Sequence, residues 1–427
     1  MTHSPRASRH DSKPLRNKQV CGGLDTLTRV GAFLVVLGAG LAVGGCGTGT
    51  GGGYTTEHIS AAKEKMNIMK SATEWEMAHQ AFLAGELDKA LKGVDRSLAI
   101  NDNVPKSHVL KGRILMERAE LEGSIDSFNK AATLDPTLVD APYYLGIAYE
   151  RINRREQSLA AYQKAAELEP SGAQYAIAAS EILIDLGRAD EAEAFLTERG
   201  GSFENNAGVR QTLGHIAMMR SDSAKAVALF NEARLLAPDD HAILEDLARA
   251  QVASSQFADA ESNLARLLRS PDHKERRDLQ HLRARCLVEV DRKLDAREAL
   301  LALTQGSAGA ADTEAWVQLG NLSYVLKDAT RTRQCAARVI ALAPERFDGY
   351  LLRGLQQRRD AKFTDALNSF DKALALGAKS DVMVLKGLVL KDLNRVDEAR
   401  AAFAQALLTN PGDPAAAAML TRVDSQD

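Results

Sequence analysis

Aromatic residues are scarce in this 427-residue chain, at 5% of the total, and cysteine occurs only four times. Low aromatic content with abundant Ala and Leu favours helices packed through small side chains over strands or ligand-filled barrels. Cysteines this few form no disulfide framework, and no CxxC or Cys/His cluster surrounds Cys286 or Cys335. We therefore expect these two residues to be small, buried apolar side chains on helices.

Catalytic and nucleic-acid-binding signals are also missing. A net charge of -3 gives the chain no excess of Lys and Arg of the kind that nucleic-acid binding requires. No HExxH, GxSxG or GxxxxGK[ST] motif occurs, and the nine histidines lack metal-ligand spacing. The sequence therefore predicts a protein without catalytic activity, cofactor, metal ion or nucleic-acid partner.

The longest uncharged run extends from Val30 to Thr56, and its apolar centre covers only residues 32–43. A bilayer-spanning helix needs about 20 predominantly apolar residues, whereas the core of a signal peptide needs about 7 to 15 behind a positively charged segment. Six Lys and Arg residues precede this core against two Asp residues. These features favour an export signal over a membrane-spanning helix.

The apolar core continues directly into Gly44-Gly45-Cys46, and here the sequence resembles a bacterial lipoprotein signal. The resemblance implies that residues 1–45 are removed and that the thiol of Cys46 carries a diacylglycerol as a thioether. An uncleaved signal anchor is the alternative, and both readings export the bulk of the chain. Many Gram-negative bacteria retain lipoproteins with Asp after the lipidated cysteine in the inner membrane, so Gly47 favours the outer membrane, facing the periplasm.

A glycine-rich run follows, and residues 46–56 are predicted to be a flexible tether. Its glycine spacing is like that of a dinucleotide-binding loop. However, that loop requires a preceding strand within a βαβ unit, and none is indicated here. We therefore expect no nucleotide at this site.

A spacing of 34 residues dominates the rest of the chain. Gly146, Tyr162, Ala165 and Pro170 each lie 34 residues after an equivalent residue, and the pattern returns around Gly214, Gly320, Gly354 and Gly387. It resembles the tetratricopeptide repeat, in which Trp, Leu, Gly and Tyr lie on a first helix, Ala, Phe and Ala on a second, and Pro at the exit. The resemblance implies an all-α fold, an α-solenoid forming a right-handed superhelix of about ten helix-turn-helix repeats.

The repeat divides residues 71–413 into ten units, and the segments outside them are predicted to be caps, because end repeats expose an apolar face. Residues 57–70 would form an N-terminal capping helix, and residues 414–427 a C-terminal capping helix and tail. Within a unit, Gly187 ends one helix and Asp190 opens the next. Thr332 and Ala336 depart from the pattern and predict a loosely packed eighth unit. The units start at residues 71, 105, 139, 173, 207, 241, 277, 313, 347 and 380.

Unit positions 2, 5, 9 and 12 lie on a first-helix stripe that is separate from the repeat signature, and this stripe should line a groove. In related repeat proteins the groove binds peptides or partner helices. The stripe includes Glu150 and Glu181. At its ends, Trp75 and Phe82 could simply be covered by residues 57–70. The candidate partner-binding residues are Arg113, Tyr143, Ile147, Ile184, His215, Arg249, Arg285, Asn321, Tyr324 and Arg358.

Lipidation signal and repeats together predict a non-enzymatic, lipid-anchored scaffold or adaptor that binds a protein or peptide segment during envelope assembly or secretion. Its architecture is similar to lipoproteins of type IV pilus biogenesis. Two alternatives remain open. One is a module that regulates or presents substrate to a polysaccharide or glycosyl-transfer enzyme; the other is a structural protein that self-assembles through its terminal repeats.

Overall fold

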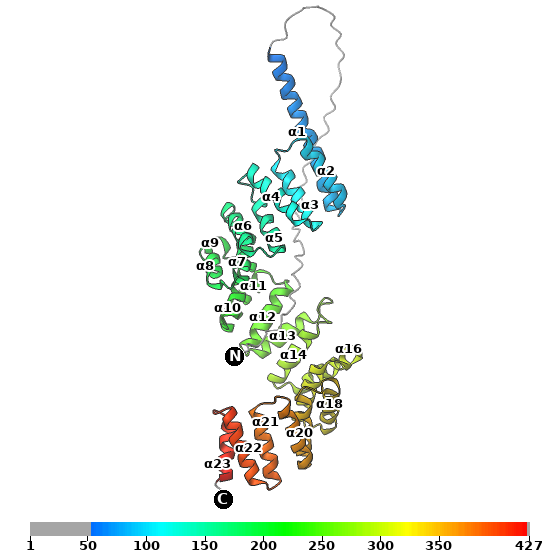
Figure 1. Cartoon of the computed structure of the whole chain (residues 1–427), viewed down its shortest axis with the longest axis vertical. Coiled ribbons are helices and arrows are strands. Elements are labelled where there is room, and N and C mark those ends of the chain that lie inside the picture. The colour runs from blue at the N-terminus through cyan, green and yellow to red at the C-terminus, as the bar shows by residue number, and fades with distance from the viewer. Residues whose placement is uncertain (1–52, 425–427) are drawn as a thin grey trace, which may run out of the picture. The chain divides into compact units, whose positions relative to one another are not determined.

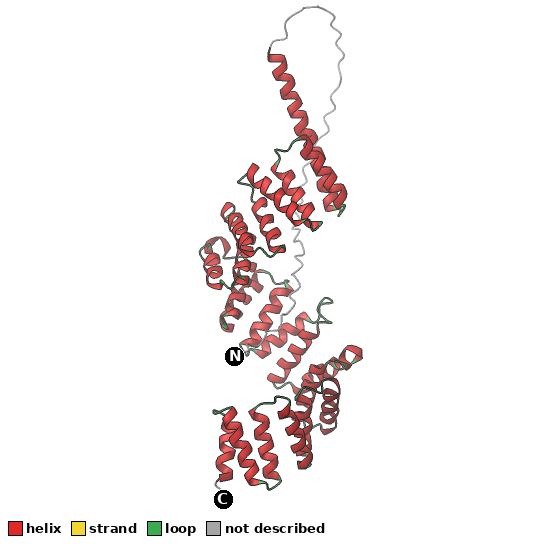
Figure 2. Cartoon of the chain, in the orientation of Figure 1, coloured by secondary structure: helices red, strands yellow, loops and turns green. Residues whose placement is uncertain are grey.

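The computed structural model describes residues 53–424, and within this range every regular element is a helix (Figures 1 and 2). The predicted all-α fold is thus confirmed. The helices are α1 (Gly53–Leu83), α2 (Leu87–Ile100), α3 (Pro105–Glu117), α4 (Leu121–Leu134), α5 (Asp140–Arg151), α6 (Arg155–Leu168), α7 (Ala173–Asp185), α8 (Ala189–Thr197), α9 (Gly200–Phe203), α10 (Ala207–Met219), α11 (Ser223–Leu236), α12 (His241–Ala253), α13 (Phe257–Leu267), α14 (Arg277–Glu289), α15 (Lys293–Leu303), α16 (Gly306–Ala310), α17 (Thr313–Val325), α18 (Ala329–Leu342), α19 (Asp348–Arg359), α20 (Phe363–Ala375), α21 (Ser380–Asp392), α22 (Val396–Thr409) and α23 (Pro414–Asp424).

The chain divides into two compact units, residues 1–62 and 63–427. Only the start of α1 is described in the first unit, and the packing discussed below belongs to the second. The predicted signal peptide, the lipidation site Cys46 and the tether up to residue 52 lie outside the described residues. None of the described helices combines the length and the hydropathy needed to cross a bilayer.

Helices of the second unit pack in chain order, as a stack of pairs. A first helix packs on its second helix, as α5 does on α6, and that second helix packs on the first helix of the next repeat, as α6 does on α7. Successive first helices also touch, among them α3 with α5, α7 with α10, and α17 with α19. This order defines a solenoid in which the first helices form one continuous face.

The turn inside each repeat contains one residue in the left-handed region, always at the fifteenth unit position. In the second repeat this residue is Ala119, with φ of 60°. The next amide, of Glu120, donates to the carbonyl of Leu115 at 2.9 Å, which is the bond that closes a Schellman-type helix end. Glycine occupies the position at Gly85 and Gly187, and the other members are Asn153, Ser221, Ser255, Asp291, Lys327, Ala361 and Asn394.

Glycine at the eighth position lets an aromatic ring of the second helix pack against the backbone of the first. A Cβ on Gly146 would lie 2.4 Å from Cε1 of Tyr162, and one on Gly112 would lie 2.5 Å from Cε1 of Phe128. Where this position is alanine, a smaller partner suffices, and Ala284 shares a buried cluster with Leu300. The size of one side chain therefore compensates for that of the other.

The eighth repeat breaks this rule without packing loosely, so that expectation is wrong. It pairs Gly320 with Ala336, and both Thr332 and Ala336 are buried. The vacant ring position is filled from the following repeat, because a Cβ on Gly320 would lie 2.6 Å from Cδ1 of Leu352. Leu352 on α19 therefore completes the packing of the eighth repeat.

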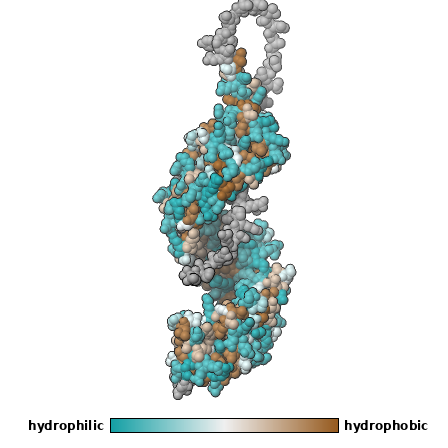
Figure 3. Space-filling model, viewed as in Figure 1, coloured by the Kyte–Doolittle hydropathy of each residue, from teal (hydrophilic) through white to brown (hydrophobic). Residues whose placement is uncertain are grey.

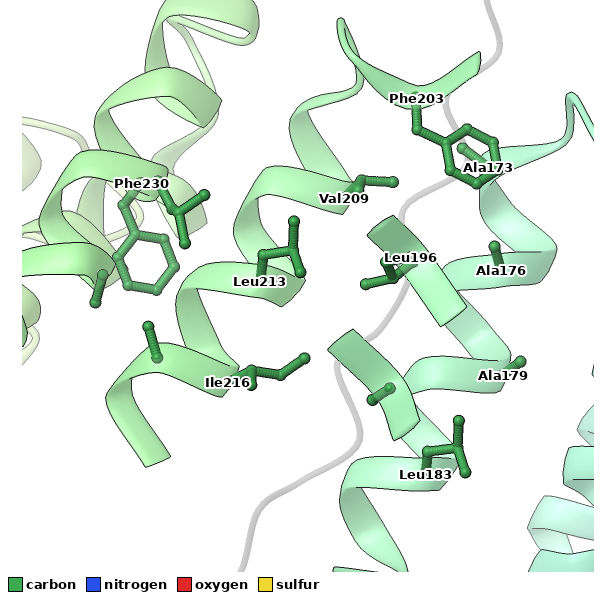
Figure 4. Close-up of a cluster of buried hydrophobic side chains, with 14 of the residues drawn as sticks. Ala173, Ala176, Ala179, Leu183, Leu196, Phe203, Val209, Leu213, Ile216 and Phe230 are labelled. Atoms are coloured by element: carbon green, nitrogen blue, oxygen red, sulfur yellow. The ribbon is translucent and has the colours of Figure 1, made fainter. Parts of the chain in front are cut away.

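Two short helices were not predicted from the sequence. In α9, Phe203 is buried beside Ala173 of α7, within the cluster drawn in Figure 4. In α16, the carbonyl of Gly309 accepts a hydrogen bond from Nε1 of Trp316 at 3.1 Å. Both helices follow the second helix of a repeat whose exit lacks the usual proline, and they fill the space before the next first helix.

The N-terminal segment differs from the prediction of a separate capping helix. Residues 57–70 belong to α1, which continues without a break to Leu83. Trp75 and Phe82 contact the next repeat instead: Nε1 of Trp75 donates to the carbonyl of Lys106 at 3.3 Å, and the Arg113 guanidinium lies 4.9 Å from the Phe82 ring centroid. At the other end, α23 packs on α22 and buries Ala416 and Val423.

Candidate functional site

The candidate residues all lie on first helices, and we call the surface that these helices form the first-helix face. On the side of the protein seen in Figure 3, hydrophobic residues are interspersed with hydrophilic ones. The structure divides the candidates into an N-terminal aromatic group, a central charged group and a C-terminal group. Arg113 lies on α3, Tyr143 and Ile147 on α5, Ile184 on α7, His215 on α10, Arg249 on α12, Arg285 on α14, Asn321 and Tyr324 on α17, and Arg358 on α19.

Arg113 is held between aromatic rings of the two neighbouring repeats. Its guanidinium lies 4.9 Å from the centroid of Phe82 on α1 and 5.0 Å from that of Tyr144 on α5. Contacts of this kind are attractive because the cation faces the negative quadrupole of the ring. Arg113 therefore joins three successive first helices instead of projecting freely.

Tyr143 lies at the centre of a tyrosine cluster. Its ring centroid is 5.4 Å from that of Tyr144, 5.9 Å from that of Tyr162 and 5.2 Å from that of Tyr175. Burial, followed by the charges of nearby groups that include Glu150 and Glu181, raises the pKa of the Tyr143 phenol. The hydroxyl of Tyr162 donates to Oε2 of Glu150 at 3.0 Å. Aromatic surface and carboxylates thus meet at one place on α5 and α7.

Glu181 on α7 is the second carboxylate at this place. Burial, and then repulsion from Glu150, raise the pKa of Glu181, and the attraction of His215 opposes this shift only in part. Within residues 53–424 its carboxylate has no hydrogen-bond or ion-pair partner. We call Tyr143, Tyr162, Glu150 and Glu181 the tyrosine–glutamate patch. The partly buried Ile147 and Ile184 pack against the core cluster beneath it.

The central candidates are bound to carboxylates of the next repeat. Nε2 of His215 lies 2.9 Å from Oδ2 of Asp246, which also accepts from Nε2 of Gln211 at 2.7 Å. Burial alone would lower the pKa of His215, but the hydrogen bond to Asp246 and the charges of Asp246 and Glu181 raise it overall. The ring of His215 also meets Phe230 edge-on, with centroids 5.3 Å apart.

Arg249 was predicted as a groove residue available to a partner, but the structure binds it within the chain. Its guanidinium donates to Glu245 at 2.8 Å and to Asp278 of the next first helix at 2.9 Å. Arg276 donates to the same two carboxylates and lowers the pKa of Asp278 to about 2. Asp278 and Glu245 are already neutralised, so Arg249 serves mainly to link repeats.

The C-terminal candidates are mixed. The Arg359 guanidinium lies 3.8 Å from the Tyr324 ring centroid, and Nε of Arg358 donates to Asp392 at 2.9 Å. Arg285 and Asn321 are exposed, and neither has a side-chain partner in the described part of the chain. These two residues alone among the C-terminal candidates are open to a partner.

Sequence reasoning missed the residues that complete these contacts. Tyr144, Asp246 and Tyr175 lie outside positions 2, 5, 9 and 12, so the stripe did not include them. Asp278 lies at position 2 of its unit but was not singled out as a candidate. The stripe did include Glu150 and Glu181, but nothing in the sequence distinguished them from the paired carboxylates. Only the contacts between neighbouring repeats reveal which charges remain uncompensated.

Potential metal ligands are scattered over the described residues. No group of three or more His, Cys, Asp or Glu residues in this range could hold a metal ion. Burial raises the pKa of Cys286 to about 11 and that of Cys335 to about 12, which disfavours the thiolate of both residues at neutral pH.

These features define an α-solenoid of two-helix repeats, and comparison with known proteins identifies the repeats. A tetratricopeptide repeat family model matches residues 143–203 and 384–421, which cover α5 to α9 and α21 to α23. These two segments therefore match tetratricopeptide repeats, whose solenoids are protein-interaction scaffolds and are generally not enzymes.

Relatives and solved structures are distant. The chain is 25% identical over 173 residues to the CTR9 homologue of Arabidopsis thaliana, a match that spans 38% of this chain but 16% of the relative. A tetratricopeptide repeat protein of Parabacteroides merdae is 14% identical, with 75% of this chain and 99% of that chain covered and a TM-score of 0.40. PilW, a widely conserved type IV pilus biogenesis factor, is 16% identical, with 48% and 95% covered and a TM-score of 0.42.

Proposed function

We propose that this protein is a scaffold that holds a segment of another protein on the first-helix face, with the tyrosine–glutamate patch as its anchor point. The observation behind this proposal is the contrast between carboxylates. Asp246, Asp278 and Asp312 each meet an Arg or His side chain of this chain. Glu181 meets none, and Glu150 accepts only a phenol hydroxyl among the described residues.

An uncompensated pair of carboxylates costs free energy when a partner covers it, unless that partner brings a cation. Tyr143, which is partly exposed beside the pair, presents an aromatic face that attracts both hydrophobic side chains and cations, whereas Tyr162 is buried beneath it. The partner segment should therefore place a Lys or Arg side chain between Glu150 and Glu181, with an apolar residue against Tyr143. Aromatic residues in such a position are typical hot spots of interfaces.

The site of action is the cell envelope. The short apolar core before Cys46, the small residues that precede it and the glycine-rich run that follows support export and lipid attachment at this cysteine. A lipid on Cys46 would hold the solenoid at the outer membrane, facing the periplasm. The bound segment would then belong to an envelope protein, with assembly or secretion as the process served and type IV pilus biogenesis as one possibility.

Site-specific photocrosslinking in cells tests the interaction. A photoreactive phenylalanine analogue that replaces Ile147 lies beside the tyrosine–glutamate patch. The same analogue in place of Leu408, a residue that is 78% exposed on a second helix, serves as the matched control. A discrete crosslinked partner from position 147 and none from position 408 supports the proposal. Equal labelling from both positions contradicts it.

The intact mass of the N-terminal fragment tests the anchor separately. Membrane-fractionated protein should yield a diacylated fragment that begins at Cys46, and Cys46→Ser should abolish it. A fragment that begins at Met1 would contradict lipid attachment while leaving the interaction surface untouched.

A further inference from the structure

Residues 63–83 are the part of α1 that belongs to the second compact unit. One face of this part of the helix is exposed to solvent. Met66, Met69 and Met77 are 47%, 70% and 48% exposed, and Thr73 between them is exposed as well. Their spacing of three or four residues places all four on one side of the helix. From Ser71 onward the opposite side packs on α2, since Ser71 bonds to Ser97 and Ala78 packs against Gly93, whereas residues 63–70 are exposed on nearly every side.

Flexible methionine side chains are common at binding surfaces, and a continuous exposed apolar stripe marks an interaction site. The charges beside the stripe change sign along the helix. Lys65 and Lys70 lie towards its start and have no ion-pair partner in residues 53–424. Glu76 lies towards its end and accepts only an amide of Gln80, at 2.9 Å.

Within residues 63–80, the first half carries three lysines against Glu64 and the second half carries Glu74 and Glu76, so this segment is complementary to a second copy running in the opposite direction. We propose that two copies of this chain associate through α1 as an antiparallel helix pair with twofold symmetry. Met66 of one copy packs against Met77 of the second copy, and Met69 packs against Thr73 of the second copy. Residues 63–80 of both helices then overlap over about 27 Å.

In this register the flanking charges also match. Lys65 faces Glu76 of the second copy, and twofold symmetry repeats the pair at the other end of the overlap. Lys70 approaches Glu74 of the second copy, a carboxylate already bound by Arg96 at 2.8 Å within its own chain. A parallel arrangement would instead set lysine against lysine. Charge therefore selects the antiparallel orientation.

Sedimentation velocity of the full chain across a range of concentrations measures the association. We expect a reversible dimer that Met69→Asp weakens at least about tenfold in its dissociation constant. Ile68→Asp is the matched control, because Ile68 is 51% exposed on the opposite side of the same helix. A chain that stays monomeric, or equal effects of the two substitutions, overturns the proposal. So would vesicle binding by a monomer that Met69→Asp abolishes, because the stripe would then face lipid.

Charge reversal and disulfide trapping test the orientation. Lys65→Glu and Glu76→Lys should each weaken the dimer, and the double variant should restore it. Mixed Met66→Cys and Met77→Cys chains should form a disulfide-linked dimer that neither variant forms alone. Crosslinking of Met66→Cys with itself, or no rescue in the double variant, contradicts the antiparallel pair.

Discussion

Leu352 fills the space beside Gly320, although the two residues belong to different repeats. In the other glycine-containing repeats that space holds an aromatic ring of the same repeat, such as Phe370 beside Gly354. Leu352 therefore adds a contact between the eighth and ninth repeats that the repeat pattern does not require.

Leu352→Ala should loosen the eighth repeat as well as its own. The substitution removes a side chain that is 1% exposed and leaves a cavity beside Gly320, at a cost of about 2 to 5 kcal/mol. Hydrogen exchange should accelerate in α17 and α18, with little change in α3 to α6. Leu408→Ala, at an exposed site, is the control and should leave all of these rates unchanged.

Gly146→Ala should destabilise the third repeat, because the added Cβ would overlap the Tyr162 ring. Overpacking of this kind costs about 1 to 3 kcal/mol. Gly201→Ala is the matched control, since nothing lies within 4 Å of a Cβ at that position. Urea denaturation followed by circular dichroism compares the two, and an unchanged midpoint for Gly146→Ala would contradict the packing described for this repeat.

Glycine should stabilise the turns that now hold other residues at positive φ. Lys327 has φ of 59° and Ala361 has φ of 56°, and a left-handed conformation costs a residue with a Cβ about 1 to 2 kcal/mol. Lys327→Gly and Ala361→Gly should therefore raise the denaturation midpoint. Ala337→Gly, at an exposed position within α18, should lower it, because glycine weakens a helix interior. If all three variants lower the midpoint, the turn conformation is not the one described.

The link between His215 and Asp246 should respond to pH. The pKa of His215 is raised in the folded chain, so the link stabilises the fold fully below the unfolded pKa of about 6.5. Its contribution is lost as the pH rises through the higher folded value. An NMR titration of the His215 ring should show a lower midpoint in Asp246→Asn. The same midpoint in both proteins would contradict a charged contact.

The repeat spacing predicts the packing within one repeat, but it does not predict the contacts between neighbouring repeats. Gly146 and Tyr162 follow a recurring spacing, so both the unit and its packing could be predicted. Leu352 and Asp246 contact the preceding repeat, and both lie at the sixth unit position, which belongs neither to the repeat signature nor to the predicted stripe. The left-handed position was missed because Ala361 and Lys327 carry no turn signature, and backbone hydrogen bonds alone impose their conformation.

The uncompensated carboxylates on α5 and α7 should hold the partner. The most direct test is the yield of the crosslinked partner from position 147 in three backgrounds: the natural sequence, Glu181→Lys and Glu298→Lys. Glu298 is an exposed carboxylate on α15 that also lacks a partner among the described residues, which makes it a matched control. We predict that Glu181→Lys abolishes the adduct and Glu298→Lys preserves it. An adduct that persists in folded Glu181→Lys protein would show that Glu181 does not hold the partner.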